Sequence, residues 1–101
     1  MKKAGINTAN KNPGELMLIC AQHGFINIIK FYESPGTYPV TFQNTFGDSL
    51  LHYAAKGSQS RTCYYLMKRG IRPIVQNKFN ETPLFAAVES GNLEVVNLIC
   101  S

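Results

Sequence analysis

The sequence contains no tryptophan, only 16% charged residues and no long apolar run among its 101 residues. A helix that crosses a membrane needs about 20 mostly apolar residues, and no stretch here approaches that length. The basic start of the chain, residues 1–12, is not followed by the apolar stretch of a secretory signal. These absences predict one intracellular domain, cytoplasmic or nuclear, without a membrane span.

Cysteine is also scarce, with Cys20, Cys63 and Cys100 lying far apart. No C-x-x-C pair and no Cys/His cluster of metal-binding spacing occurs, so the sequence predicts no metal site. Each cysteine lies inside an apolar pattern, and we expect reduced thiols that face the core. Cys63 and Cys100 in particular fall on helical positions that should point inward.

Little of the chemistry of an enzyme is present. The only histidines are His23 and His52, and no Ser/His/Asp or Cys/His arrangement is suggested by spacing. The carboxylates are scattered without an acid and base pair: Glu15, Glu33, Asp48, Glu81, Glu89 and Glu94. Glycine-rich phosphate loops are absent. We therefore expect no catalytic residues, no cofactor and no small-molecule substrate.

What the sequence does contain is an internal repeat. Residues 49–68 align with residues 82–101 at an offset of 33 positions. The matched pairs include Ser49 and Thr82, Leu51 and Leu84, Ala54 and Ala87, and Leu66 and Ile99. A period of this length is typical of stacked repeat arrays.

Each repeat reads as two short helices joined by a turn. Helices are predicted at about 12–22, 25–32, 49–56, 60–69, 83–89 and 93–100. Asn12, Ser49 and Thr82 are expected to cap the first helix of each pair with their side chains, and Pro13 and Pro83 suit a first helical position. Gly36 and Gly70 are expected at positive φ after the second helices, and Asn80 should tolerate a left-handed conformation.

The segment TPLFAAVESGNLEVVNLI, from Thr82 to Ile99, resembles the signature of the ankyrin repeat family. Ser49-Leu50-Leu51-His52 keeps the capping hydroxyl and the histidine of that signature. The resemblance implies an all-α solenoid of helix–turn–helix pairs with short β-turn fingers. It places repeats at about 12–43, 44–76 and 77–101, after a flexible segment at 1–11. It also implies that His52 is structural and bonds the Ser49 hydroxyl and nearby backbone.

The family resemblance implies a non-enzymatic module that binds another protein through its concave wall. The matching exposed positions are Gln43, Thr45, Phe46, Asp48, Tyr53, Lys56, Gln76, Lys78, Phe79, Glu81, Glu89 and Ser90, and also Gly57 and Ala86. Phe46 and Phe79 occupy the same place in two fingers. They either anchor a partner or pack on one another, and the sequence leaves both possibilities open.

Two other functions compete with this interpretation. Between residues 49 and 80 the sequence has no acidic residue and six basic ones, which suits nucleic acid or acidic lipid: Lys56, Arg61, Lys68, Arg69, Arg72 and Lys78. The chain could also be the adaptor segment of a larger protein. The last helix keeps an apolar pattern (Val95, Val96, Leu98, Ile99 and Cys100), so we expect further repeats, a second copy or a partner to cover it.

Overall fold

The computed structural model describes residues 13–33 and 39–100, and this part of the chain contains six helices. They are α1 Pro13–His23, α2 Ile26–Glu33, α3 Leu50–Lys56, α4 Ser60–Lys68, α5 Pro83–Ser90 and α6 Leu93–Cys100. The predicted helix pairs are confirmed, and no helix bound differs from its prediction by more than one residue. The expected segment 1–11, the Asn12 cap and Gly36 lie outside the described residues.

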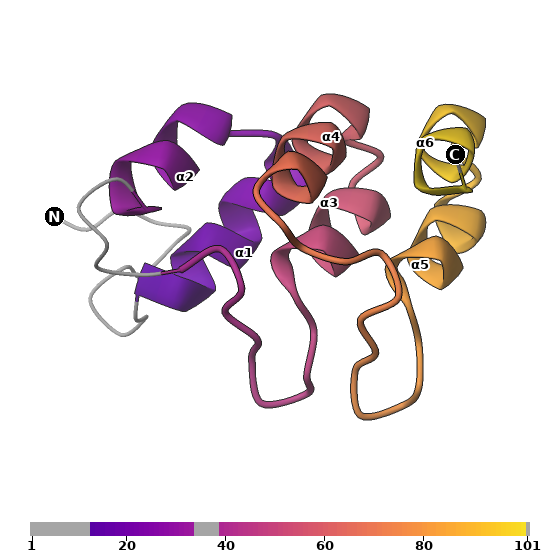
Figure 1. Ribbon diagram of the computed structural model, residues 1–101, viewed down its shortest axis with the longest axis horizontal. Helices are drawn as coiled ribbons and strands as arrows, with labels where there is room; N and C mark the ends of the chain where they lie inside the picture. Colours follow the sequence, from indigo (N-terminus) through magenta and orange to yellow (C-terminus); the bar gives the residue numbers. More distant parts are fainter. Residues whose placement is uncertain (1–12, 34–38, 101) are drawn as a thin grey trace, which may run out of the picture.

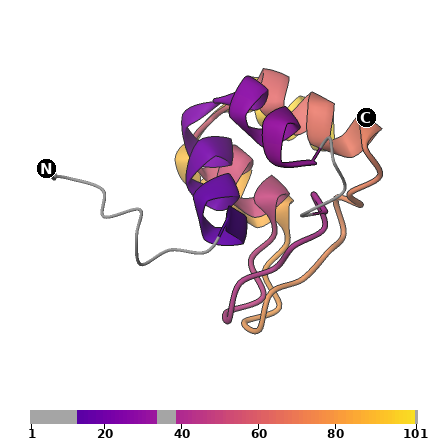
Figure 2. The ribbon, with the colours of Figure 1, turned by 90° about the vertical axis from the view of Figure 1, so that its left-hand side faces the viewer.

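The six helices form a two-layered stack (Figure 1). Helices α1, α3 and α5 lie side by side in one layer, and α2, α4 and α6 form the other. Two long finger-like loops, residues 39–49 and 70–82, project from the same edge of the stack (Figure 2). This arrangement is the all-α solenoid of helix–turn–helix pairs with projecting fingers that the family resemblance implied.

The core runs along the stack where the first helices meet. Ala54 and Ala55 of α3, Ala21 of α1 and Ala87 of α5 are all fully buried. Their small side chains let neighbouring helices approach closely, and larger residues such as Leu51 fill the space between the layers.

Enlarging these alanines should destabilise the stack. We expect Ala54→Leu or Ala87→Leu to lower the free energy of unfolding by about 1–3 kcal/mol, because extra methylene groups overpack a closed site. Urea denaturation provides the measurement. Glu89→Leu introduces the same side chain at an exposed position of α5 and serves as the control. Unchanged stability of both alanine variants would contradict this packing register.

A polar cluster joins the second helices of the first two repeats. Glu33 of α2 accepts hydrogen bonds from Tyr65 Oη at 2.7 Å and from Arg69 Nε at 2.6 Å, and it forms an ion pair with Arg69. Burial raises the pKa of Glu33, but the hydrogen bonds from Arg69 and Tyr65 outweigh it and hold this pKa below its ordinary value. Burial, together with the Glu33 hydrogen bond, raises the pKa of Tyr65 to about 12.

A buried weak acid, Cys63, and a partly buried one, Tyr65, predict a loss of stability in alkali. Burial raises the pKa of the fully buried Cys63 thiol to about 12, whereas an unfolded thiol ionises near 9. Because the native thiol keeps its proton while the unfolded one loses it, stability is complete below pH 9 and falls as the pH rises towards 12. The slope from Cys63 is at most about 1.4 kcal/mol per pH unit. Tyr65 adds to it above about pH 10.

Urea midpoints measured between pH 8 and pH 11 test this alkaline loss. Cys63→Val removes the thiol and supplies the side chain that repeat three has at the matching position, Val96. We expect the decline of this variant with pH to be shallower than that of the parent. Equal slopes would contradict the role of Cys63.

No described residue covers one face of the third repeat, which is clearest when its residues are compared with those 33 positions earlier. His52 is 4% exposed, whereas its counterpart Phe85 is 46% exposed. Ala55 is fully buried, whereas Val88 is 61% exposed. The uncovered face therefore includes the first helix, α5, which the sequence pattern of the last helix did not indicate.

The last helix differs from its prediction in two residues. Val95 is fully buried against the preceding layer and is not part of the uncovered face. Cys100 is exposed, so the expectation that it points inward was wrong. Val96, Leu98 and Ile99 of the same helix remain partly buried.

Candidate functional site

The two fingers are built on the same asparagine turn. In the first, Asn44 Oδ1 accepts the backbone N–H groups of Phe46 and Asp48, both at 2.9 Å. In the second, Asn77 Oδ1 accepts those of Phe79 at 2.8 Å and Glu81 at 3.0 Å. Such side-chain bonds to the backbone fold a short loop without a strand ladder. The position of the asparagine in each loop therefore determines the turn at the tip of the finger.

Each tip contains one residue with left-handed backbone, Gly47 at φ +81° and Asn80 at φ +64°. The prediction for Asn80 is confirmed. At Gly47 a side chain would also collide with the second finger, because an added Cβ would lie 3.0 Å from Asn77 Cα and from Lys78 N. Glycine therefore permits the two fingers to touch.

The fingers contact each other through backbone and side chains. Lys78 N donates to Phe46 O at 2.8 Å, and Asn77 Nδ2 donates to Asp48 Oδ1 at 2.8 Å. The rings of Phe46 and Phe79 stack with centroids 6.4 Å apart and planes inclined by 23°. They remain 56% and 65% exposed. The rings thus pack on one another and still present a joint apolar surface to solvent.

His52 fixes the base of the second finger to α3. Ser49 N donates to His52 Nδ1 at 3.0 Å, which requires Nδ1 to be unprotonated and places the ring proton on Nε2. Nε2 then donates to Glu81 O at 2.7 Å, and the Ser49 hydroxyl accepts from His52 N at 3.2 Å. The structural role that the family resemblance implied for His52 is present, and both of its nitrogens are occupied.

The equivalent cap in the third repeat differs from the prediction. Thr82 occupies the N-cap position of α5, but its side chain makes no capping hydrogen bond. The amide of Phe85 bonds instead to the carbonyl oxygen of Thr82 at 3.0 Å. Phe85 also lacks the ring nitrogen with which His52 completes the capping box of α3. The hydrogen-bonded box therefore occurs in α3 and not in α5.

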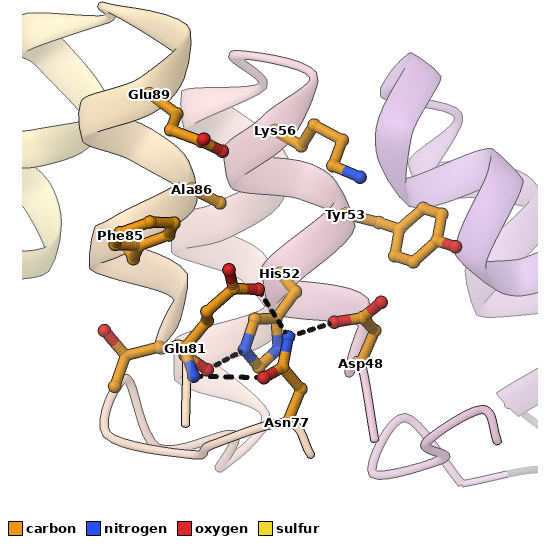
Figure 3. A pocket seen from close by; sticks show the side chains of 10 residues that line it. Asp48, His52, Tyr53, Lys56, Asn77, Glu81, Phe85, Ala86 and Glu89 are labelled. Carbon is orange, nitrogen blue, oxygen red and sulfur yellow. Dashed lines mark hydrogen bonds between the residues drawn. The ribbon is translucent and has the colours of Figure 1, made fainter. Parts of the chain in front are cut away.

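A pocket lies at the junction of α3, α5 and the base of the second finger (Figure 3). Its lining residues are Asp48, His52, Tyr53, Lys56, Asn77, Glu81, Thr82, Phe85, Ala86 and Glu89. The structure thus brings together Asp48, Tyr53, Lys56, Glu81 and Glu89 of the predicted site, together with Ala86. These side chains come from three separate segments of the chain.

The charges around this pocket are mostly negative. Glu89, Glu81 and Asp48 contribute carboxylates, and Asn77 Nδ2 bonds one oxygen of the latter two at 2.9 and 2.8 Å. Lys56 is the only basic side chain in the lining, and its Nζ lies 5.4 Å from the centre of the Tyr53 ring. Burial raises the pKa of Tyr53, and the charge of Asp48 adds to this. The pocket therefore favours a cationic group over an anionic one.

Sequence reasoning missed Phe85 and Asn77 as parts of this pocket. Phe85 stands 33 positions after His52, so the exchange of a bonding histidine for an unbonded aromatic ring was visible in the repeat alignment. Asn77 is only 8% exposed, and its role depends on the approach of the two fingers. No single-chain pattern signals that approach.

The remaining predicted residues lie elsewhere. Six are exposed on the fingers, namely Gln43, Thr45, Phe46, Gln76, Lys78 and Phe79. Ser90 is exposed at the end of α5, where its hydroxyl donates to Ala87 O at 2.9 Å. The Gln43 side chain donates to Gly47 O at 2.7 Å and also lines a different groove. The predicted surface thus divides into a fingertip group and a pocket group.

The six basic residues proposed for an acidic partner do not share one surface. Lys56 lines the acidic pocket, Lys78 lies on a finger, and Arg69 is paired with Glu33. The other three also differ in their surroundings. Arg61 lies beside α6, Lys68 contacts the Tyr64 ring, and Arg72 follows α4 in the loop to the second finger. The charge cluster seen in the sequence is dispersed by the fold.

Residues 13–33 and 39–100 contain neither a membrane-spanning helix nor a cluster of metal ligands. No helix there has the length and apolar character needed to cross a membrane. In the same residues, no three His, Cys, Asp or Glu side chains gather in a way that could hold a metal ion.

Comparison with known proteins agrees with the fold. The family profile described as "Ankyrin repeats (3 copies)" matches residues 5–101. The chain is also similar to the ankyrin repeat protein L271 of Acanthamoeba polyphaga mimivirus, with 30% identity over 76 residues. That match covers 75% of this chain and 10% of the relative, so the chain spans about one tenth of the relative's length. With three helix pairs, paired fingers and a profile match over nearly its whole length, the chain belongs to the ankyrin repeat family.

Proposed function

We propose that this protein binds another protein through the concave surface formed by the fingertip group and the pocket group. Ankyrin repeats are generally protein–protein interaction modules and are typically non-enzymatic. The observation that carries the proposal is the exposed Phe46–Phe79 pair, held in place by the backbone bond between the two fingers. An aromatic surface that is already ordered offers contact area at little entropic cost.

The electrostatics favour a protein partner over nucleic acid. Three carboxylates surround the pocket, and a phosphate backbone would be repelled from them. The basic residues that could attract phosphate lie on separate surfaces. In a longer protein the same surface would serve as an adaptor. The mimivirus relative supports this alternative, because the match covers only 10% of its length.

The fingertip pair should act as a binding hot spot. We expect Phe46→Ala combined with Phe79→Ala to weaken partner binding by about 2 kcal/mol or more, because both rings would lose buried contact area. A partner isolated with the intact domain can be titrated by calorimetry against the parent and the double variant. The matched control is Phe31→Ala with Leu93→Ala, which removes two side chains of 71% and 70% exposure away from the fingers.

Two measurements separate anchoring from packing. Thermal stability of the double fingertip variant should change little, since the rings are more than half exposed. A lowered melting temperature with unchanged partner affinity would mean that the rings serve only to hold the fingers together. Equal losses of affinity in the control variant would also contradict the proposed surface.

A further inference from the structure

A second groove lies between the two segments that lead into the fingers. It is lined by Thr41, Gln43, Ser49, Gly70, Ile71, Arg72, Ile74 and Val75 and has a volume of about 470 Å³. None of these residues lines the acidic pocket at α3 and α5. We propose that this groove binds a short extended peptide segment of a partner protein, in which an apolar side chain lies close to a carboxylate.

The apolar part of the groove comes from one short segment. Ile71, Ile74 and Val75 supply its apolar side chains, and Ile74 is 66% exposed. The exposed apolar surface of Ile74 borders the groove. An apolar side chain of a ligand that enters the groove would cover this surface. Thr41 and Gln43 add a hydroxyl and an amide on the opposite wall.

The walls of the groove are fixed before any ligand arrives. Ile71 N donates to Leu66 O at 3.2 Å, which ties the segment to α4, and Val75 N donates to Arg72 O at 3.1 Å. On the other side, Gln43 Nε2 donates to Gly47 O at 2.7 Å. A site with preset walls loses little conformational freedom when a peptide binds.

The charge of the groove favours a carboxylate in the ligand, beside the apolar side chain. Arg72 is the only charged residue in the lining, and it is exposed. Among the described residues, the ion pair that is present joins Glu33 to Arg69 and does not involve Arg72. A guanidinium without a partner matches a carboxylate with two parallel hydrogen bonds. This complementarity favours an acidic residue beside the apolar one.

Selection from a random hexapeptide library displayed on phage, using the folded protein as bait, tests the proposal. Enriched peptides should combine a large apolar residue with Asp or Glu. A synthetic, fluorescein-labelled copy of an enriched peptide should lose about tenfold or more in affinity for Arg72→Glu and for Ile74→Asp. The matched controls are Arg61→Glu and Leu93→Asp, an arginine on α4 and an apolar side chain of 70% exposure on α6, and these should bind as the parent does.

Amide chemical shifts separate this groove from the concave surface. The peptide should perturb the amides of residues 71–75, and its affinity should be unchanged in the Phe46→Ala and Phe79→Ala double variant. Enriched peptides without an acidic residue, equal binding to Ile74→Asp, or perturbations centred on the fingertips or on Glu89 would each overturn the proposal. So would dimerisation of the protein that perturbs residues 71–75, since the occupant would then be a second copy.

Discussion

Cys63 should react with a thiol reagent about a thousandfold more slowly than an ordinary thiol while the protein is folded. Burial raises its pKa to about 12, about three units above an ordinary thiol, and the thiolate is the reactive form. The side chain is also fully buried, so the reagent reaches it only after the structure opens. Cys100, which is exposed on α6, should react quickly.

Single-cysteine variants make this difference measurable. Cys20→Ala with Cys100→Ala leaves Cys63, and Cys20→Ala with Cys63→Ala leaves Cys100. The rates of reaction with a disulfide reagent at neutral pH are compared before and after addition of urea, and in urea both thiols should react alike. Rapid labelling of Cys63 in the folded protein would show that it is not buried.

Gly57→Ala should lower the free energy of unfolding by about 3 kcal/mol, the upper part of the range for overpacking. An added Cβ would lie only 1.9 Å from the backbone oxygen of Gln22, at the end of α1. Neither atom can move without shifting the first repeat against the second. The family resemblance placed Gly57 among the exposed positions. In the structure, the side of Gly57 on which a Cβ would stand faces the backbone of Gln22.

Gly91→Ala is the matched comparison, because it changes the corresponding turn of the third repeat. Gly91 has φ +74°, and no atom lies within 4 Å of an added Cβ. Only backbone strain remains there, with a cost of about 1 kcal/mol. Gly57 has φ −84°, so its substitution tests the steric contact alone. Equal melting temperatures for the two variants would contradict the close approach of α1 and α3.

The sequence predicted local features of the fold well because they depend on residues close together in the chain. Helix bounds follow from caps and glycines, and the left-handed Asn80 follows from the same turn chemistry as Gly47. The repeat offset then placed the fingers side by side. The structural role of His52 followed from the family resemblance, and its partner Ser49 lies three residues away.

Features that depend on contacts between repeats were harder to predict. The basic residues are close in sequence, but the fold does not gather all six, because they belong to α3, α4, the loop after α4 and the second finger. Cys100 follows the same helical pattern as Cys63, yet no further helix lies beyond it in the described residues. The groove beside Arg72 arises from two segments about 30 positions apart, and neither has a recognisable motif.

The uncovered face of the third repeat determines where local unfolding begins. Among the described residues, helix α6 packs mainly against α4 and α5, and Val95 is its single fully buried side chain. In a linear stack each helix pair is stabilised by its contacts with its neighbours. A helix pair with a neighbour on one side alone detaches at a fraction of the free energy of complete unfolding. Amide protons of α6 should therefore exchange with solvent before those of α3. A molecule that covers Phe85 and Val88 raises the free energy of this local opening by its own binding free energy, and the exchange of α6 slows accordingly.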